Sequence, residues 1–235
     1  MKGSAYLVAQ CECCFGRGFS DFDILVEKEH IGVAEKALLL KGWQQEEIDD
    51  YDEKYYRQWM HEIPPLIHVG RNSVIDLHHN ILALTNKDSL QNIQLRTKIV
   101  NHHKAGEVAI LAEEDMVIHS AVHLLSESEY QNALRDLSDL DMLIREFMAT
   151  DGFINNLVER ANVLGLHQYL FFALRYTDLV LNTPIPKHAY TRLSSASMSK
   201  LQLKLADFCF LNIFSPNHSS CRSWERGLAE FLLYW

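Results

Sequence analysis

Two carboxylates stand two positions apart in the run Arg-Gly-Phe-Ser-Asp-Phe-Asp-Ile-Leu-Val from Arg17 to Val26. Because alternate side chains of a strand share a face, Asp21 and Asp23 should point the same way, with Phe22, Ile24 and Val26 pointing the opposite way into a core. Adjacent carboxylates repel each other unless a cation lies between them, and oxygen ligands favour Mg²⁺ or Mn²⁺. The alternative is a turn at Asp21 that leaves Asp23 solvated.

A second strand-like run, Val-Ile-Asp-Leu-His from 74 to 78, carries one more acid. Asp76 and His78 share one face of such a strand, and the aliphatic residues beside them share the other. This pattern mirrors the first acidic strand. His78 and His79 are either polar residues at a strand end or ligands.

The chain opens with Lys2-Gly3-Ser4, and residues 4 to 14 then contain no Pro or Gly and carry apolar residues at near-helical spacing. We predict a helix that begins just after Gly3. A glycine there lets the backbone approach a phosphate closely, and the exposed N–H groups and helix dipole favour an anion. Lys2 either adds a positive charge or is a frayed terminal residue.

Taken together, these motifs resemble those of the nucleotidyltransferase superfamily, and in particular a poorly characterised bacterial group of nucleotidyltransferase family proteins. The likeness spans roughly residues 2 to 145 in family order. The motifs are Lys2-Gly3-Ser4, the Ser-Asp-Phe-Asp-Ile-Leu-Val strand 20–26, the Asp-Leu-His strand 74–78, His119-x3-His123, and Leu-Arg-Asp-Leu-x-Asp-Leu at 134–140.

The resemblance implies an enzyme that moves a nucleoside monophosphate from an NTP such as ATP to a hydroxyl group of a small-molecule or protein acceptor. It implies in-line chemistry with Mg²⁺ or Mn²⁺ as cofactor, and it puts Asp76 where the acceptor hydroxyl loses its proton. The implied metal ligands and catalytic residues are Asp21, Asp23 and Asp76, and the implied phosphate-binding residues are Lys2, Gly3 and Ser4.

The same resemblance implies that the helical half forms the acceptor-facing wall, with His119 and Arg135 near the carboxylates. From the residues alone, His119 and His123 lie one helical turn apart, and packing or ligation are both open to them. Arg135, Asp136 and Asp139 are typical of a helix-surface ion-pair set.

Relatives carry a strand before their Lys-Gly pair, whereas this sequence has only Met1 there. We therefore expect weaker nucleotide binding by this chain than by one extended upstream.

Composition narrows the class of partner. The 235 residues include 31 acidic and 22 basic side chains, and the formal net charge of −9 disfavours nucleic acid as a partner. No apolar run approaches the roughly 20 residues that span a bilayer, so no membrane contact is predicted and the cytoplasm is the default location.

Five cysteines, three of them at Cys11, Cys13 and Cys14, match no zinc pattern and indicate reduced thiols in a core.

The predicted fold class is α+β, with a nucleotidyltransferase-like mixed sheet and helices in residues 1–112 and an all-helical domain in 113–235. Besides the two acidic strands, the first domain should contain a helix at 30–41, a solvated acidic loop at 44–54, strands at 55–63 and 66–69 joined as a meander, a loop and helix from 80, and a strand at 108–111.

Helical periodicity in the second domain predicts helices at 113–126, 130–149, 151–164, 167–182, 187–213 in one or two pieces, and 222–235. The last of these ends in an apolar aromatic run, which is either buried or a homodimer contact.

Two other functions remain open at this point. One is a binding or regulatory protein that keeps the fold without catalysis. The other is a metal-dependent phosphohydrolase that uses the histidine pairs.

Overall fold

The structure is a computed structural model that describes residues 1–16, 18–19, 21–45, 48–89, 95–126, 130–193, 199–216, 218 and 223–234. Contacts divide the chain into two compact units, Met1–Met116 and Val117–Trp235, and each is described by itself. The described part of the first unit combines sheets with helices, and that of the second is helical. The predicted α+β fold is therefore confirmed, while the domain boundary predicted after residue 112 stays a prediction.

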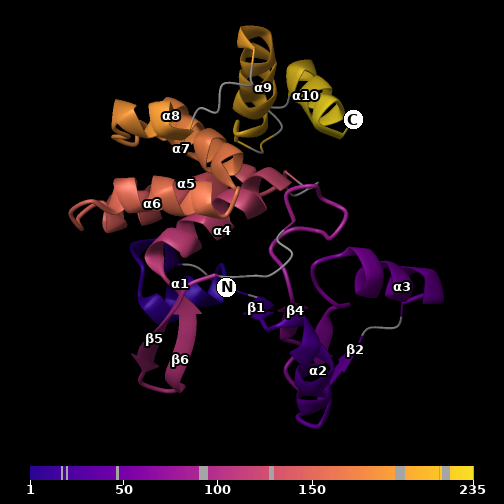
Figure 1. Cartoon of the computed structure of the whole chain (residues 1–235). Helices are drawn as coiled ribbons and strands as arrows, with labels where there is room; N and C mark the ends of the chain where they lie inside the picture. Colours follow the sequence, from indigo (N-terminus) through magenta and orange to yellow (C-terminus); the bar gives the residue numbers. More distant parts are fainter. Residues whose placement is uncertain are drawn as a thin grey trace. The chain divides into compact units, whose positions relative to one another are not determined.

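The main sheet of the first unit has four strands in the order β1-β4-β3-β2. They are β1 (Asp21–Leu25), β2 (Trp43–Gln45), β3 (Leu66–His68) and β4 (Val74–His78). Strand β1 pairs in parallel with β4, while β3 pairs antiparallel with both β4 and β2 (Figure 1). Both acidic strands predicted from alternation are present and are neighbours.

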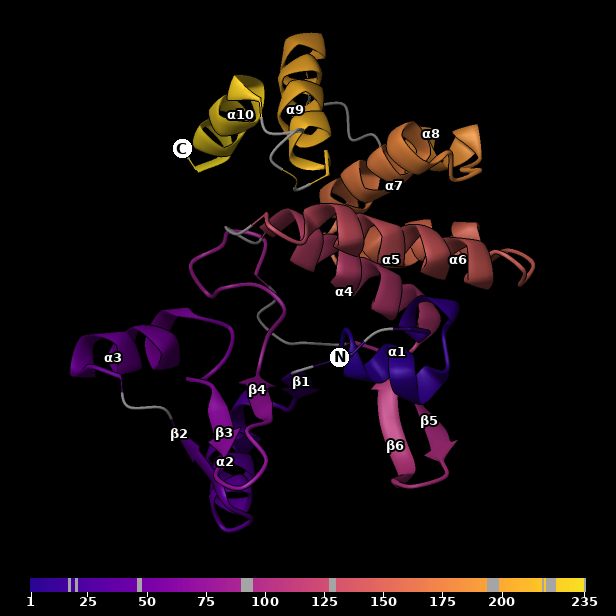
Figure 2. The same ribbon diagram turned by 180° about the vertical axis from the view of Figure 1, so that it is seen from behind.

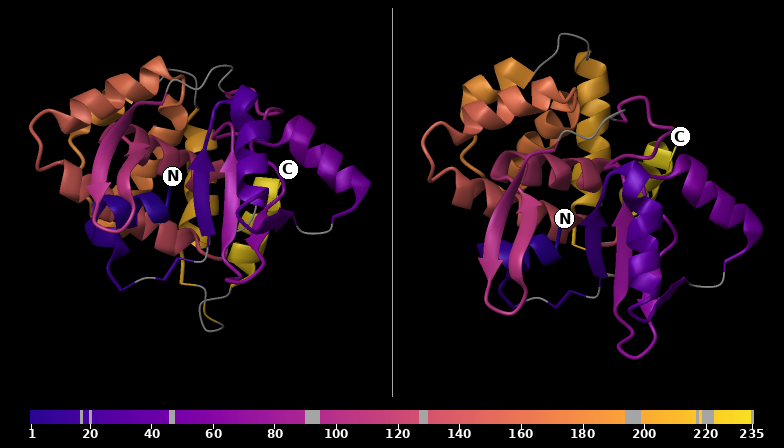
Figure 3. Two further views of the ribbon diagram at one scale, coloured as in Figure 1. Left: turned by 90° about the horizontal axis from the view of Figure 1, so that it is seen from below. Right: turned by 60° about the horizontal axis from the view of Figure 1, so that its bottom comes forward.

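Helix α2 (Ile31–Leu39), which follows a short 3-10 turn at Lys28–His30, packs on one face of this sheet (Figure 3, right). Its apolar stripe supplies the contact, as the sequence predicts. The buried core consists of Trp43, Ile63, Leu66, Ile75 and Leu77, against which Val26, Ile31, Ala34 and Leu38 pack. Alternation along β4 thus leaves Asp76 and His78 on the opposite face.

The expectation that Phe22 and Ile24 point into a core is wrong, because these side chains are 42% and 38% exposed. They lie on β1, which is one of the two edge strands of the described sheet, whereas α2 contacts β2 and β4. An edge strand has a neighbour on one side only, so its apolar residues are covered less completely.

The acidic stretch 44–54 is largely exposed where it is described, as predicted, but it is not a loop, and the strand predicted at 55–63 is wrong over residues 55–59. Strand β2 is followed, beyond residues 46 and 47 that lie outside the described part, by helix α3 (Asp50–Trp59). The Asp49 carboxylate accepts a hydrogen bond of 2.8 Å from the Asp52 backbone N–H and caps α3. Acidic residues in a first turn are favoured by the helix dipole, so these charges mark a helix start.

Arg57 ties α3 to α2, since its Nη2 donates a hydrogen bond of 2.8 Å to Glu35 Oε1. After α3 the chain returns to the sheet through Glu62, which forms an isolated antiparallel bridge with His78, and Ile63, whose N–H donates to the Leu77 carbonyl at 3.1 Å. The Pro64-Pro65 turn then leads into β3. The predicted meander is therefore wrong: β3 pairs with β2 and β4, and helix α3 lies between β2 and β3 in the chain.

A second sheet consists of β5 (Thr97–His102) and β6 (Gly106–Leu111), paired antiparallel as a hairpin. The predicted strand at 108–111 is confirmed. The helix predicted between residues 80 and 107 is wrong at 97–102, and residues 90–94 lie outside the described part. Figure 2 shows α1 (Ser4–Ala9) beside the hairpin, and α1 contacts both strands.

Helix α1 begins after Gly3 as predicted but ends earlier, at Gln10, which adopts a left-handed conformation. A 3-10 turn at Glu12–Cys14 follows. Cys11, Cys13 and Cys14 are buried, which confirms the core assignment, and Cys221 lies outside the described residues.

In the described part of the second unit there are seven helices, of which α4 begins within the first unit. They are α4 (Glu113–Ser126), α5 (Ala133–Phe147), α6 (Phe153–Val163), α7 (His167–Leu181), α8 (Lys187–Leu193), α9 (Lys200–Ile213) and α10 (Trp224–Tyr234). The sequence predicts each of them within a few residues. Among the described residues, no helix is long and apolar enough to cross a membrane.

One detail of α5 differs from the sequence expectation. Asp136 and Asp139 are each only 4% exposed, so they do not form a helix-surface set. The Arg135 guanidinium, at its Nη2, lies 3.1 Å from Asp136 Oδ1, and its own side chain is half exposed. The arginine therefore covers a buried carboxylate.

Candidate functional site

Parallel pairing of β1 and β4 places Asp23 directly opposite Asp76. Neighbouring strands lie about 4.8 Å apart, so the two residues stand side by side, with Asp21 two positions along β1 on the same face. Asp21 is exposed, whereas Asp23 and Asp76 are partly buried. The structure thus brings together the three acids that the sequence singles out.

The charge of this cluster shows in the Asp76 carboxyl, whose pKa is raised from 3.8 to about 6. Burial is the largest cause, followed by the negative charges of Glu62, Asp23 and Asp21, while His78 lowers the pKa. In the metal-free protein the ionised Asp76 is therefore disfavoured by its surroundings.

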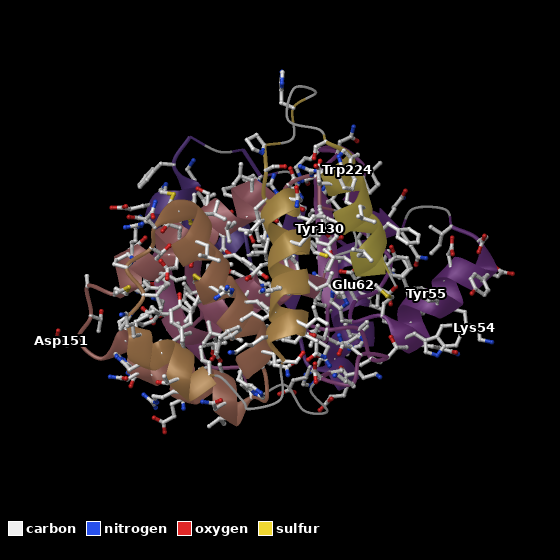
Figure 4. The ribbon with its side chains drawn as sticks, turned by 90° about the horizontal axis from the view of Figure 1, so that it is seen from above. Lys54, Tyr55, Glu62, Tyr130, Asp151 and Trp224 are labelled. Carbon is white, nitrogen blue, oxygen red and sulfur yellow. The ribbon has the colours of Figure 1, made fainter. Side chains whose placement is uncertain are left out.

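A second group, His61, Glu62 and His78, joins this face and is absent from the sequence-based site. One ligand atom from each of the three lies within 4.8 Å of the others, so together they could hold a metal ion. Glu62 is labelled in Figure 4. The His61 and His78 rings stack with centroids 5.3 Å apart and planes at 30°.

His78 connects the two groups. Its Nε2 lies 3.4 Å from Asp23 Oδ1, and its Nδ1 lies 3.3 Å from Glu62 Oε2. The second contact lacks hydrogen-bond geometry, and the buried Nδ1 has no hydrogen-bond partner among the described residues. Tyr56 of α3 also lies near this face. Burial raises the pKa of its hydroxyl group, and the charges of Glu62 and Asp76 raise it further.

These residues fit a divalent cation. Four carboxylates and two imidazoles offer oxygen and nitrogen ligands, and the charges of the neighbouring acids add to the effect of burial in raising the pKa of Asp76. A cation would offset these charges and satisfy the buried imidazole nitrogen of His78.

The residues predicted to bind the nucleotide phosphates lie beside β1, since α1 contacts this strand and the Met1 nitrogen donates a hydrogen bond of 2.5 Å to the Asp23 carbonyl. Gly3 has a φ of +60°, and a Cβ there would lie 3.0 Å from the Phe19 ring, so a larger residue would strain the turn. Lys2 is 9% exposed and is therefore not a frayed residue.

A cavity of about 570 Å³ opens at the carboxyl ends of β1 and β4. Lys28, Lys87 and His79 give it basic groups, and Asn80 and Ser89 give it neutral polar ones. Glu27 and Glu29 also line it. A volume of this size suits a small-molecule ligand.

His119 and His123 lie on α4 with ring centroids 6.2 Å apart, and His119 is 6% exposed. They do not belong to a group of metal-ligand geometry among the described residues. His119 and Arg135 are both in the second unit, and their approach to the carboxylates stays a prediction.

Comparison with known families bears on the class of protein. The family described as uncharacterised nucleotidyltransferase matches residues 1–182, most of the chain, and the chain belongs to this family. This membership supports nucleotidyl transfer as the general activity and a nucleotide as substrate. Searches of curated proteins and of solved structures gave no significant match.

Proposed function

We propose that this protein is a metal-dependent nucleotidyltransferase that moves a nucleoside monophosphate from an NTP, such as ATP, to a hydroxyl group of a small-molecule or protein acceptor. One observation carries the proposal: Asp23 and Asp76 are paired on adjacent parallel strands, and Asp21 lies beside them. The raised pKa of Asp76 accompanies this arrangement. A stiff sheet that holds repelling carboxylates together is suited to bind a divalent ion.

Asp21, Asp23 and Asp76 would hold Mg²⁺ or Mn²⁺, which when bound offsets the charge of the nucleotide phosphates. Asp76 also accepts the proton of the acceptor hydroxyl. A carboxylate whose pKa is raised towards neutrality is a better base than an ordinary one, because its affinity for the proton is higher.

Lys2, Gly3 and Ser4 would bind the phosphates. Gly3 allows the backbone to approach them closely, Ser4 offers its hydroxyl group and Lys2 its positive charge. The contact between α1 and β1 supports this assignment, since it keeps the segment next to the acidic strand.

The acceptor would bind in the cavity at the ends of β1 and β4. Ligands of open α/β sheets bind outside the carboxyl ends of parallel strands, and these strands are the parallel pair of the sheet. Because the two lysines and two glutamates that line the cavity balance each other, and Asn80 and Ser89 add neutral polar groups, an uncharged polar acceptor suits it best.

Calorimetric titration with Mg²⁺ and then with a non-hydrolysable ATP analogue tests the proposal. The wild-type protein should bind the analogue only with Mg²⁺ present, and Asp21→Asn and Asp23→Asn should lose this binding. Asp151→Asn, an exposed change of the same charge in the second unit, serves as the control. A protein that binds neither ligand would instead be a scaffold. A separate incubation with ATP and Mg²⁺ identifies a phosphohydrolase, which would consume ATP without an acceptor.

A further inference from the structure

Three residues beside the aspartates offer a different set of ligand atoms. His61 and His78 contribute imidazole nitrogen, and Glu62 contributes one carboxylate oxygen, all within 4.8 Å. Mg²⁺ prefers oxygen and keeps much of its water, whereas two imidazoles and a carboxylate suit zinc and its neighbours in the transition series.

The spacing of these atoms also suits zinc. His78 Nδ1 and Glu62 Oε2 are 3.3 Å apart, and two ligands at about 2.0 Å from a tetrahedral ion are separated by about the same distance. His78 is 8% exposed, and its Nδ1 lacks a hydrogen-bond partner in the described part of the chain. A buried imidazole nitrogen ordinarily has a partner, and a metal ion would provide one.

The backbone of all three residues is fixed by the sheet. Glu62 and His78 form a β-bridge, and the His79 N–H donates a hydrogen bond of 2.8 Å to the His61 carbonyl. The ligands thus come from two segments already held side by side, so binding would require little more than side-chain rotation.

The other nitrogen of His78 faces a carboxylate. Nε2 lies 3.4 Å from Asp23 Oδ1, and histidines that bind zinc through one nitrogen commonly donate the N–H of the other to a carboxylate. Such a partner fixes the tautomer and the orientation of the ring.

We propose that His61, Glu62 and His78 form a binding site for Zn²⁺ or a similar transition metal, separate from the aspartate site and linked to it through His78. The three residues occupy three positions of a tetrahedral ion and leave the fourth for water. Zinc at this site neutralises Glu62 and orients His78 towards Asp23. Through this contact, the zinc ion helps to position Asp23 for the ion at the aspartate site.

Titration of the metal-free full chain with Co²⁺, followed by visible absorption, tests the site without reference to activity. We expect one equivalent with the intense bands of a tetrahedral nitrogen and oxygen site, and Zn²⁺ should displace it. Competition with a chromophoric chelator then gives the Zn²⁺ affinity. His61→Ala, Glu62→Gln and His78→Ala should each weaken it about 100-fold or more, because loss of a ligand costs at least as much as loss of its supporting partner.

Controls separate this site from the aspartate site. His30→Ala removes an exposed imidazole of the same unit and should leave Zn²⁺ affinity unchanged. Asp21→Asn should also keep tight Zn²⁺ binding, whatever it does to Mg²⁺ and nucleotide. If His78→Ala does not fold, the Zn²⁺ affinity of the nearly isosteric variant Glu62→Gln tests the proposal. Unchanged Zn²⁺ affinity in Glu62→Gln, or equal loss in Asp21→Asn, would overturn the proposal.

Discussion

Replacing Asp76 by asparagine should stabilise the metal-free protein, although this residue is central to the proposed site. The folded pKa of about 6 lies about two pH units above the ordinary value of 3.8. At about 1.4 kcal/mol per pH unit, the ionised carboxylate costs at most about 3 kcal/mol at neutral pH. Solvent screening of a partly exposed group reduces this cost, so we expect Asp76→Asn to raise the free energy of unfolding by about 1–2 kcal/mol.

Urea denaturation followed by circular dichroism, at neutral pH with a chelator and then with Mg²⁺, measures both halves of this prediction. With Mg²⁺ at ten times its dissociation constant, the wild-type protein should gain about 1.4 kcal/mol through linkage. Asp76→Asn should gain less, because an amide is a poorer ligand than a carboxylate. The stability difference between the two proteins should therefore shrink or reverse.

Asp151→Asn controls for the change in net charge, since Asp151 is exposed and belongs to the second unit (Figure 4). If Asp76→Asn lowered the stability of the metal-free protein instead, the carboxylate would be stabilised by its surroundings. The repulsion that supports a cation site would then be refuted.

Because the folded pKa of Asp76 is raised, its contribution to stability is full below about pH 4 and is lost as the pH rises through about 6. Urea denaturation with a chelator should therefore show a free energy of unfolding that falls over this pH range in the wild-type protein and not in Asp76→Asn. If the fall persists in Asp76→Asn, another group causes it. Asp21→Asn or Asp23→Asn should abolish the rise in melting temperature on Mg²⁺ addition, and a retained rise would place the ion elsewhere. Leu77→Ala should cost about 2–5 kcal/mol in chemical denaturation, because Leu77 is fully buried under α2; a cost below 1 kcal/mol would contradict that packing. Arg226→Ala should cost about 1–3 kcal/mol by the same assay, since the buried guanidinium donates to the backbone carbonyls that precede α5 and follow α9, and a neutral effect would mean that α10 does not depend on it.

The acidic strands could be predicted because their pattern is local. In β1 and β4, acids alternate with apolar residues, and alternation alone determines which side chains share a face. The helices α4 to α10 could be predicted for a similar reason, since apolar residues recur with helical period and Gly or Pro separates the segments.

Helix α3 could not be found in this way. Its sequence, Asp-Tyr-Asp-Glu-Lys-Tyr-Tyr-Arg-Gln-Trp, carries no aliphatic residue, and its aromatic residues favour strands. The Asp49 cap and the acids after it were the available signal. Strand β5 was missed because alternation in Thr-Lys-Ile-Val-Asn-His is broken by two adjacent apolar residues.

The candidate site likewise contains residues that the sequence pattern reveals and residues that only the folded chain brings together. Spacing within strands predicts that Asp21 and Asp23 share a face, the family resemblance adds Asp76, and parallel pairing brings the two strands together. His61 and Glu62 carry no such signal, because they reach His78 only through the path of the chain between α3 and β3. The cavity likewise depends on segments far apart in the sequence, from Leu25 to Thr97.

Transfer of label from the α-phosphate of an NTP to an acceptor tests most directly whether this protein is a nucleotidyltransferase that depends on Asp76. The protein is incubated with Mg²⁺, α-labelled NTPs and a cell extract separated into small molecules and proteins, and labelled products and released pyrophosphate are measured together. We predict equal amounts of labelled acceptor and pyrophosphate for the wild-type protein and almost none for Asp76→Asn, with Asp151→Asn active. Transfer that survives in Asp76→Asn, or pyrophosphate release that no acceptor accompanies, would contradict the account.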